Sequence, residues 1–158
     1  MRQEISITYE RFEHWNELAD SDQKLVEMAY AISKTAYAPY SKFHVGASLL
    51  LSNGEIITGS NQENIAYPSG LCAERVALFY AGANYPNEKV DTLCVVAKGD
   101  LLPLDKILSP CGACRQVLLE TETRQNKDYR VILVSQNGVS IVINAAKDLL
   151  PLAFGITE

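Results

Sequence analysis

Apolar and polar residues alternate along this chain with periods that predict both helices and strands. One run at helical spacing consists of Leu25, Met28, Ala29, Ile32 and Ala36. Asp20 and Gln23 stand just before this run in the arrangement of a capping box, and Pro39 blocks its continuation. We therefore expect a helix over residues 22–37.

Four short segments have strand composition and come in two pairs, each pair flanking an Asn-Gly dipeptide. Both residues of Asn-Gly tolerate a positive φ, so the dipeptide suits a two-residue hairpin turn. The expected hairpins join 45–51 to 55–59 across Asn53-Gly54 and 130–135 to 139–143 across Asn137-Gly138. A fifth apolar run, 91–97, has the composition of a buried strand.

Two further helices are expected to begin at cysteines, over residues 72–83 and 111–121, and a short one over 145–150. The element order is then α-β-β-α-β-α-β-β-α. This order, with its two antiparallel hairpins, predicts an α/β fold, a three-layer α/β/α sandwich with a five-stranded mixed sheet. Residues 1–20 are polar with scattered aromatics, so we expect an N-terminal extension to a single domain over 21–158.

Composition narrows the class of protein. The 158 residues are 47% hydrophobic and 21% charged, which is enough to form one core and excludes a disordered chain. A net charge of −5 disfavours a nucleic-acid partner and favours a small molecule. No segment reaches the roughly 20 apolar residues of a membrane helix, and the first residues lack a signal-peptide core, so we expect a cytoplasmic protein without a membrane partner.

Three of the four cysteines form a pattern typical of a catalytic zinc site. Cys111 and Cys114 have the spacing at which two sulfurs share one tetrahedral metal, and Cys72 is expected to supply a third thiolate. Three protein ligands leave the fourth position open, whereas a structural zinc site has four. Cys94 lies among β-branched residues and is expected in the core.

Charged residues beside these cysteines supply proton transfer and charge balance. Glu74, two residues after Cys72, is placed to act as a general acid and base. Zn²⁺ and three thiolates sum to a net negative charge, which opposes deprotonation of water. Helix N-termini and the guanidinium of Arg75 or Arg115 are expected to offset this charge, and Arg75 is the one that we expect to hydrogen-bond a thiolate.

Other interpretations of the cysteines are open at this point. A thioredoxin-like redox motif would follow the first strand of a βαβ unit, and it would leave Cys72 and Glu74 without roles. A purely structural zinc site would need a fourth ligand. His14 is expected to face solvent in the extension, and His44, in a loop, receives no role.

With these residues in view, the sequence resembles the small, homotetrameric cytidine deaminases of the cytidine and deoxycytidylate deaminase superfamily. Zinc deaminases carry a Cys or His, then x-Glu, and later Pro-Cys-x-x-Cys; the corresponding segments here are 72–74 and 110–114. A Cys at the first position resembles enzymes of free nucleosides, since those acting on deoxycytidylate, polynucleotides or tRNA carry His. The resemblance runs over residues 22–155, so 21–158 is expected to be the catalytic domain.

The resemblance also implies a set of substrate contacts. Residues 40–47 resemble the family segment Y-S-x-F-x-V-G-A, whose Phe lines the pyrimidine pocket, and residues 61–64 match the N-x-E-N that binds the ribose 3′-hydroxyl. Two backbone positions resemble those that contact the amide face of the base, and a Phe near the C-terminus resembles one that reaches into a neighbouring subunit's site. The expected pocket residue is Phe43, and the residues expected at the 3′-hydroxyl are Asn61 and Glu63. The two backbone positions are Ala73 and Ser109, and the C-terminal Phe is Phe154.

The function that the resemblance implies is zinc-dependent hydrolytic deamination of free cytidine and 2′-deoxycytidine, in pyrimidine salvage. Glu74 then moves protons from water to N3 of the pyrimidine and to the amino group, which leaves as ammonia. One alternative is the deamination of another aminopyrimidine nucleoside, such as a blasticidin-type antibiotic, although a sugar-hydroxyl clamp suits a plain ribonucleoside. A zinc-stabilised module that binds or edits RNA or DNA would need a basic cluster that the sequence lacks. A catalytically inactive relative would have lost a metal ligand or the acid/base residue, whereas every residue to which we assign chemistry is present.

Overall fold

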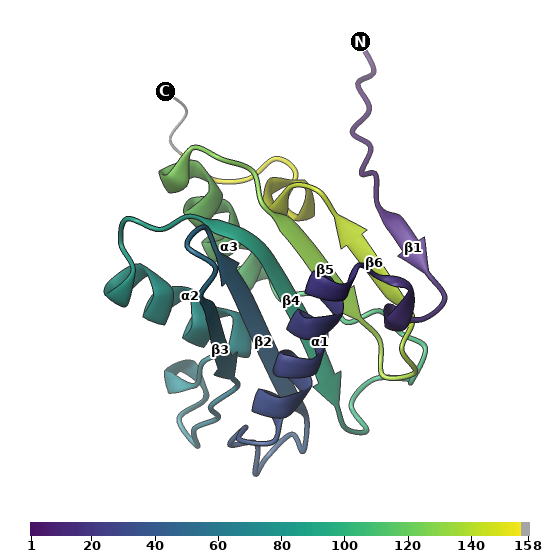
Figure 1. Ribbon diagram of the computed structural model, residues 1–158, viewed down its shortest axis with the longest axis vertical. Helices are drawn as coiled ribbons and strands as arrows, with labels where there is room; N and C mark the ends of the chain where they lie inside the picture. Colours follow the sequence, from purple (N-terminus) through teal and green to yellow (C-terminus); the bar gives the residue numbers. More distant parts are fainter. Residues whose placement is uncertain (156–158) are drawn as a thin grey trace.

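A six-stranded mixed sheet forms the centre of the computed structural model, which describes residues 1–155 (Figure 1). Its strand order is β1-β6-β5-β4-β2-β3. The strands are β1 Glu10–Phe12, β2 His44–Leu51, β3 Ile56–Ser60, β4 Val90–Lys98, β5 Arg130–Val134 and β6 Ser140–Ile143. β4 and β5 are parallel, and every other neighbouring pair is antiparallel.

Helices cover both faces of this sheet. The helices are α1 Asp20–Ser33, α2 Ala73–Asn84 and α3 Gly112–Gln125, with short 3-10 turns η1 Trp15–Glu17, η2 Tyr67–Ser69 and η3 Ala146–Leu149. α1 lies on one face, and α2, α3 and η3 pack on the other (Figure 1). The expected α/β/α sandwich is therefore confirmed. None of the helices in the described part of the chain is both long and apolar enough to span a membrane.

β4 supplies both cores, because successive side chains of a strand point to opposite faces. Leu93 and Val95 pack with α2 and α3, while Cys94 and Val96 pack with α1. Cys94 is fully buried, as expected, and burial raises the pKa of its thiol far above the usual range.

Two glycines let the helices approach the sheet closely. A β-carbon on Gly46 of β2 would lie 1.9 Å from the carbonyl oxygen of Ala29 in α1. A β-carbon on Gly59 of β3 would lie 2.8 Å from the carbonyl oxygen of Ala73, at the start of α2. Close packing of α2 on β3 fixes the position of the residues around Cys72, at the N-terminus of that helix.

The strand count differs from the expectation of five. Residues 10–12 of the extension pair antiparallel with β6, with Phe12 opposite Ser140, and form a sixth strand at the edge of the sheet. Three residues are too few to show a period, so the sequence pattern did not reveal this strand. His14, expected to face solvent, is half-buried beside Gly138.

Three helices also differ from the expected bounds. The helix expected over 111–121 continues to Gln125. The first helix ends at Ser33 and not near residue 37, because the amide of Tyr37 donates to the carbonyl oxygen of Asn61 and the chain joins the segment after β3. The last predicted helix is a single 3-10 turn, Ala146–Leu149. Both expected hairpins form, but their turns differ from the expected two-residue type. The Leu51 amide donates to the Glu55 carbonyl oxygen and the Ser135 amide to that of Val139, so three residues make each turn, and of each Asn-Gly pair only Gly54 or Gly138 has positive φ.

Candidate functional site

Three thiols meet where α2 and α3 begin. Cys72 is the N-cap of α2, Cys111 is the N-cap of α3, and Cys114 lies in the first turn of α3. The Sγ atoms of Cys72 and Cys111 are 3.9 Å apart, and those of Cys111 and Cys114 are 3.6 Å apart. All three sulfurs lie within 4.8 Å of one another.

This cluster fits one zinc ion. Zn–S bonds of about 2.3 Å at tetrahedral angles place two sulfurs about 3.8 Å apart, close to the two separations above. Three members make up the cluster within residues 1–155, which leaves a fourth tetrahedral position for a ligand that is not protein. Cys72 and Cys111 stand at the N-termini of α2 and α3, and the positive end of a helix dipole stabilises nearby thiolates.

Arg75 lies against the cluster. Its Nη2 donates to Cys72 Sγ at 3.5 Å. The pKa of Cys72 falls to about 5, because hydrogen bonds from the Cys114 thiol and from Arg75 stabilise its thiolate against the opposing effect of burial. Cys72 is thus a thiolate at neutral pH, as a metal ligand must be.

Arg115 makes other contacts than the expected one to a thiolate. Its Nε donates to the carbonyl oxygen of Pro110, Nη1 to that of Leu149 and Nη2 to Ser109 Oγ, each at 2.9 Å. All three guanidinium nitrogens are therefore engaged with the loop before Cys111 and with η3. Their arrangement gives Arg115 a role in holding this loop, and Arg75 is the guanidinium that reaches a cysteine.

Glu74 is buried in the first turn of α2, with 5% of its surface exposed. Burial raises its pKa to about 7, and the thiolate of Cys72 adds to this rise. A carboxyl group with a pKa near the working pH both accepts and donates protons readily. Cys72 and Cys114 are among its neighbours, so this buried carboxyl group lies at the junction of α2 and α3.

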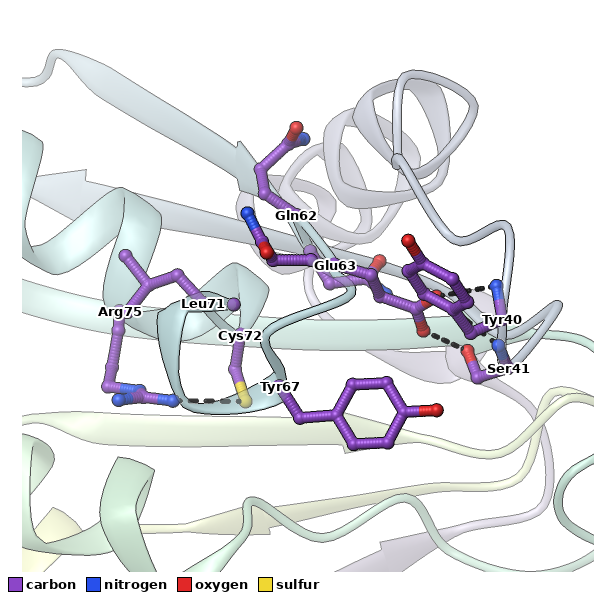
Figure 2. A pocket seen from close by; sticks show the side chains of 11 residues that line it. Tyr40, Ser41, Gln62, Glu63, Tyr67, Leu71, Cys72 and Arg75 are labelled. Carbon is purple, nitrogen blue, oxygen red and sulfur yellow. Dashed lines mark hydrogen bonds between the residues drawn. The ribbon is translucent and has the colours of Figure 1, made fainter.

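A cavity of about 500 Å³ opens beside the cluster. Figure 2 shows Arg75 and Cys72 at one end of it and Glu63, Tyr40 and Ser41 at the other. The complete set of lining residues is Tyr40, Ser41, Asn61, Gln62, Glu63, Asn64, Tyr67, Gly70, Leu71, Cys72 and Arg75.

Glu63 links its own segment of the cavity wall to the loop that contains Tyr40 and Ser41. Its carboxylate accepts from the amides of Tyr40, at 2.9 Å, and Ser41, at 3.2 Å, and from the Ser41 hydroxyl (Figure 2). Asn61 accepts from the Val45 amide at 2.8 Å and donates to the Phe43 carbonyl oxygen at 2.9 Å. Each amide atom of Asn61 keeps a further lone pair or N–H for a ligand.

The family model described as the cytidine and deoxycytidylate deaminase zinc-binding region matches residues 19–127. The matched range contains all three clustered cysteines and Glu74. The chain belongs to this family.

Named relatives agree with this membership in the zinc-binding deaminase family. A cytidine deaminase of Sporosarcina psychrophila is 41% identical over 132 residues, which cover 84% of this chain and 90% of that protein. The crystal structure of cytidine deaminase from Burkholderia pseudomallei matches with a TM-score of 0.71 and 38% identity, covering 84% of this chain and 98% of that one. A blasticidin-S deaminase of Bacillus cereus is more distant, at 29% identity over 87% of this chain and 94% of that protein.

The residues expected from the deaminase family at the substrate fall into two groups. Asn61 and Glu63 line the same cavity as Cys72. The remaining residues do not line this cavity. Phe43 and Ala73 are buried. Ser109 is exposed and hydrogen-bonded to Arg115, and Phe154 is 87% exposed. The carbonyl oxygen of Phe154 accepts from Gln116 Nε2 at 2.9 Å, which anchors the last described residues to α3.

Two tyrosines of the cavity had no role in the sequence prediction. The rings of Tyr40 and Tyr67 meet edge to face, with centroids 5.9 Å apart. Tyr40 begins the segment that carries Phe43, and Tyr67 lies just before Cys72 in the chain. Exposed aromatic residues in loops beside the deaminase motifs were the signal that could have found them.

Proposed function

We propose that this chain catalyses the zinc-dependent hydrolytic deamination of free cytidine and 2′-deoxycytidine, which yields uridine or 2′-deoxyuridine and ammonia. The observation that carries the proposal is the buried carboxyl group of Glu74 beside three thiols that fit one zinc ion. The adjacent cavity, lined by Asn61 and Glu63, has the polar groups to hold a sugar. Relatives named cytidine deaminase, at 38 to 41% identity, add support.

The metal would be held by Cys72, Cys111 and Cys114. When bound, a zinc ion supplies Lewis-acid chemistry, which lowers the pKa of water from 15.7 in bulk to about 7 and so provides a nucleophile at neutral pH. Arg75 withdraws negative charge from Cys72 through its hydrogen bond and so limits how strongly that thiolate opposes this effect.

Glu74 moves the protons of the reaction. Its carboxylate accepts a proton from the attacking water and passes it to N3 of the pyrimidine. A C4–O bond forms; Glu74 then takes the remaining proton from the new C4 hydroxyl and delivers it to the amino group, and the C4–N bond breaks as ammonia leaves and the C4 carbonyl forms. A pKa near 7 suits both directions of transfer.

Asn61 and Glu63 would bind the ribose 3′-hydroxyl, because an amide and a carboxylate together both donate and accept. Phe43 and the backbone near Ala73 and Ser109 would contact the base. We further propose a cytoplasmic homotetramer acting in pyrimidine salvage, in which the exposed Phe154 contacts the site of a neighbouring subunit.

A spectrophotometric assay of cytidine loss tests this function. Purified protein should turn over cytidine and 2′-deoxycytidine, and a zinc chelator should abolish the activity. Blasticidin S serves as the comparison substrate, because the Bacillus cereus relative is named for it. Turnover of blasticidin S without turnover of cytidine would replace the proposed substrate, and activity that survives complete removal of zinc would contradict the mechanism.

A further inference from the structure

The N-terminal extension is bound to the turn between β5 and β6. Residues 1–18 precede the region that the deaminase family model matches, which begins at residue 19. Within them, β1 pairs with β6 along the edge of the sheet (Figure 1). The amide of Trp15 then donates to the carbonyl oxygen of Gly138 at 2.9 Å. Backbone pairing therefore holds the extension to β6 before His14 and to the β5–β6 turn after it.

The imidazole of His14 occupies the space that a side chain at position 138 would fill. A β-carbon built on Gly138 would lie 2.4 Å from His14 Cδ2 and 2.5 Å from Nε2. The φ of Gly138 is +98°, a conformation that glycine adopts without strain. His14 Nδ1 accepts from the amide of Asn16 at 3.2 Å, which orients the ring. The imidazole ring of His14 therefore packs against the β5–β6 turn at a position where a side chain would collide with it.

The same turn holds the loop that follows β4. Gln136 Oε1 accepts from the amide of Gly99 at 3.0 Å, and its Nε2 donates to the carbonyl oxygens of Gly99 at 2.8 Å and of Leu102 at 3.1 Å. The amide of Asn137 donates to the carbonyl oxygen of Leu104 at 3.0 Å. Four hydrogen bonds thus link residues 136–137 to residues 99–104.

Gly99 in turn packs against a loop of the candidate substrate cavity. A β-carbon on Gly99 would lie 2.5 Å from the carbonyl oxygen of Lys42 and 3.0 Å from Phe43 Cα. Tyr40 and Ser41, just before them in the chain, line the cavity. Contacts therefore run without a gap from the extension, through the β5–β6 turn and the loop after β4, to the cavity.

We infer that the N-terminal extension positions the substrate loop of this site. His14, seated on Gly138, holds the β5–β6 turn, and Gln136 of that turn sets the loop that supports Phe43. Both are positioning residues, and none of these contacts reaches the three cysteines or Glu74. Loss of either residue is therefore expected to weaken substrate binding and to leave the chemical step intact. The kinetic part of this inference rests on the proposed function.

Steady-state kinetics of His14→Ala, Gln136→Ala and the double variant test the inference. Each single variant should raise KM for cytidine about three- to tenfold with kcat within about twofold and an unchanged zinc content. Because both residues act through one turn, the double variant should raise KM no further than the stronger single one, whereas independent effects multiply. The control is Glu13→Ala, since the Glu13 side chain is 78% exposed and pairs with Arg11.

Hydrogen–deuterium exchange of the intact protein supplies a readout that needs no activity. His14→Ala and Gln136→Ala should both speed amide exchange at residues 99–104, while Glu13→Ala should not. Unchanged exchange of this loop in His14→Ala, a rise spread evenly through β4, or KM effects that multiply would each overturn the inference. A wild-type protein that does not deaminate cytidine would instead overturn the proposed function and leave the exchange test in force.

Discussion

Glu74 illustrates how the surroundings of one side chain set its chemistry. In water a glutamate is fully ionised at neutral pH, and it would hold a proton too weakly to return it to a leaving group. At the N-terminus of α2 this carboxyl group is buried beside the thiolate of Cys72, and its pKa rises to about 7. Arg75, one residue further, acts in the opposite sense on Cys72, because its guanidinium stabilises the thiolate. The surroundings therefore favour the neutral form of Glu74 and the charged form of Cys72, although the two residues are only two positions apart.

Replacement of Glu74 by Gln should abolish proton transfer while preserving the shape of the site. We expect kcat for cytidine to fall by about 10²- to 10⁴-fold, with zinc content and melting temperature retained. Kinetics together with elemental analysis measure these effects, and Glu55→Gln, on the exposed β2–β3 turn, is the matched control. A Glu74→Gln variant with normal turnover would remove Glu74 from the mechanism.

Replacement of Arg75 by Gln should shift the pH dependence of activity. Without the guanidinium, more negative charge stays on Cys72, so water at the metal is harder to deprotonate. The acidic limb of the kcat profile should therefore move to higher pH. Arg115→Gln provides a comparison, since its contacts go to Pro110, Leu149 and Ser109. If the two variants give the same pH profile as the wild type, Arg75 does not tune the thiolates.

Among the elements, α2 and α3 carry the proposed zinc ligands and Glu74, and both helices pack on the same face of the sheet. Both begin at a cysteine, so their N-termini bring amides and thiolates to one point. α1 lies on the opposite face and contributes stability through its contact with β5. There Arg130 forms two hydrogen bonds with Asp22, at 3.1 and 2.7 Å.

Replacement of Arg130 by Met should lower the free energy of unfolding by about 2 to 3 kcal/mol, because the Asp22 carboxylate is left buried without its partner. Met keeps most of the aliphatic length of the arginine. Lys147→Met is the control, since Lys147 pairs with the exposed Asp128 and such pairs contribute about 1 kcal/mol or less. Urea denaturation measures both variants. Equal losses of unfolding free energy in the two variants would show that the Asp22–Arg130 pair stabilises the fold no more than an exposed ion pair does.

For the whole molecule, the core and the metal are separate sources of stability. Two apolar cores enclose the sheet, and residues on both faces of β4 are fully buried. The cysteine cluster stands at one edge of the larger core, with Cys111 exposed to solvent. We therefore expect folding not to depend on zinc, in contrast to small domains that lack a core.

Removal of zinc should abolish activity while leaving the chain folded. Because three assembled thiols bind zinc more tightly than the unfolded chain does, we expect the chelated protein to melt at a lower temperature, with circular dichroism at 25 °C essentially unchanged. Addition of zinc should restore both the melting temperature and the turnover of cytidine. Loss of secondary structure on chelation would show instead that the metal is required for the fold.

The sequence alone determined those features whose physics is local. The two Asn-Gly pairs predicted hairpins, because Gly54 and Gly138 adopt positive φ without strain. The Cys-x-x-Cys spacing predicted a shared metal, because both sulfurs lie on one helical turn. Cys72 and Glu74 were predicted from their resemblance to a deaminase motif together with metal-ligand chemistry. The buried run of β4 was equally clear from its composition.

Only the tertiary structure decided which distant segments meet. The sequence predicted the contact of Arg75 with a thiolate, but it did not predict that Arg115 reaches the carbonyl oxygen of Leu149 through the packing of α3 against η3. The sixth strand pairs with β6, and His14 packs on Gly138 in the β5–β6 turn. Both contacts join the N-terminal residues to a segment far along the chain. Glu74 is likewise buried beside Cys114, a residue of α3 that lies 40 positions later in the chain. Long-range contacts and desolvation leave no periodic trace in a sequence, and for that reason these features emerged only in three dimensions.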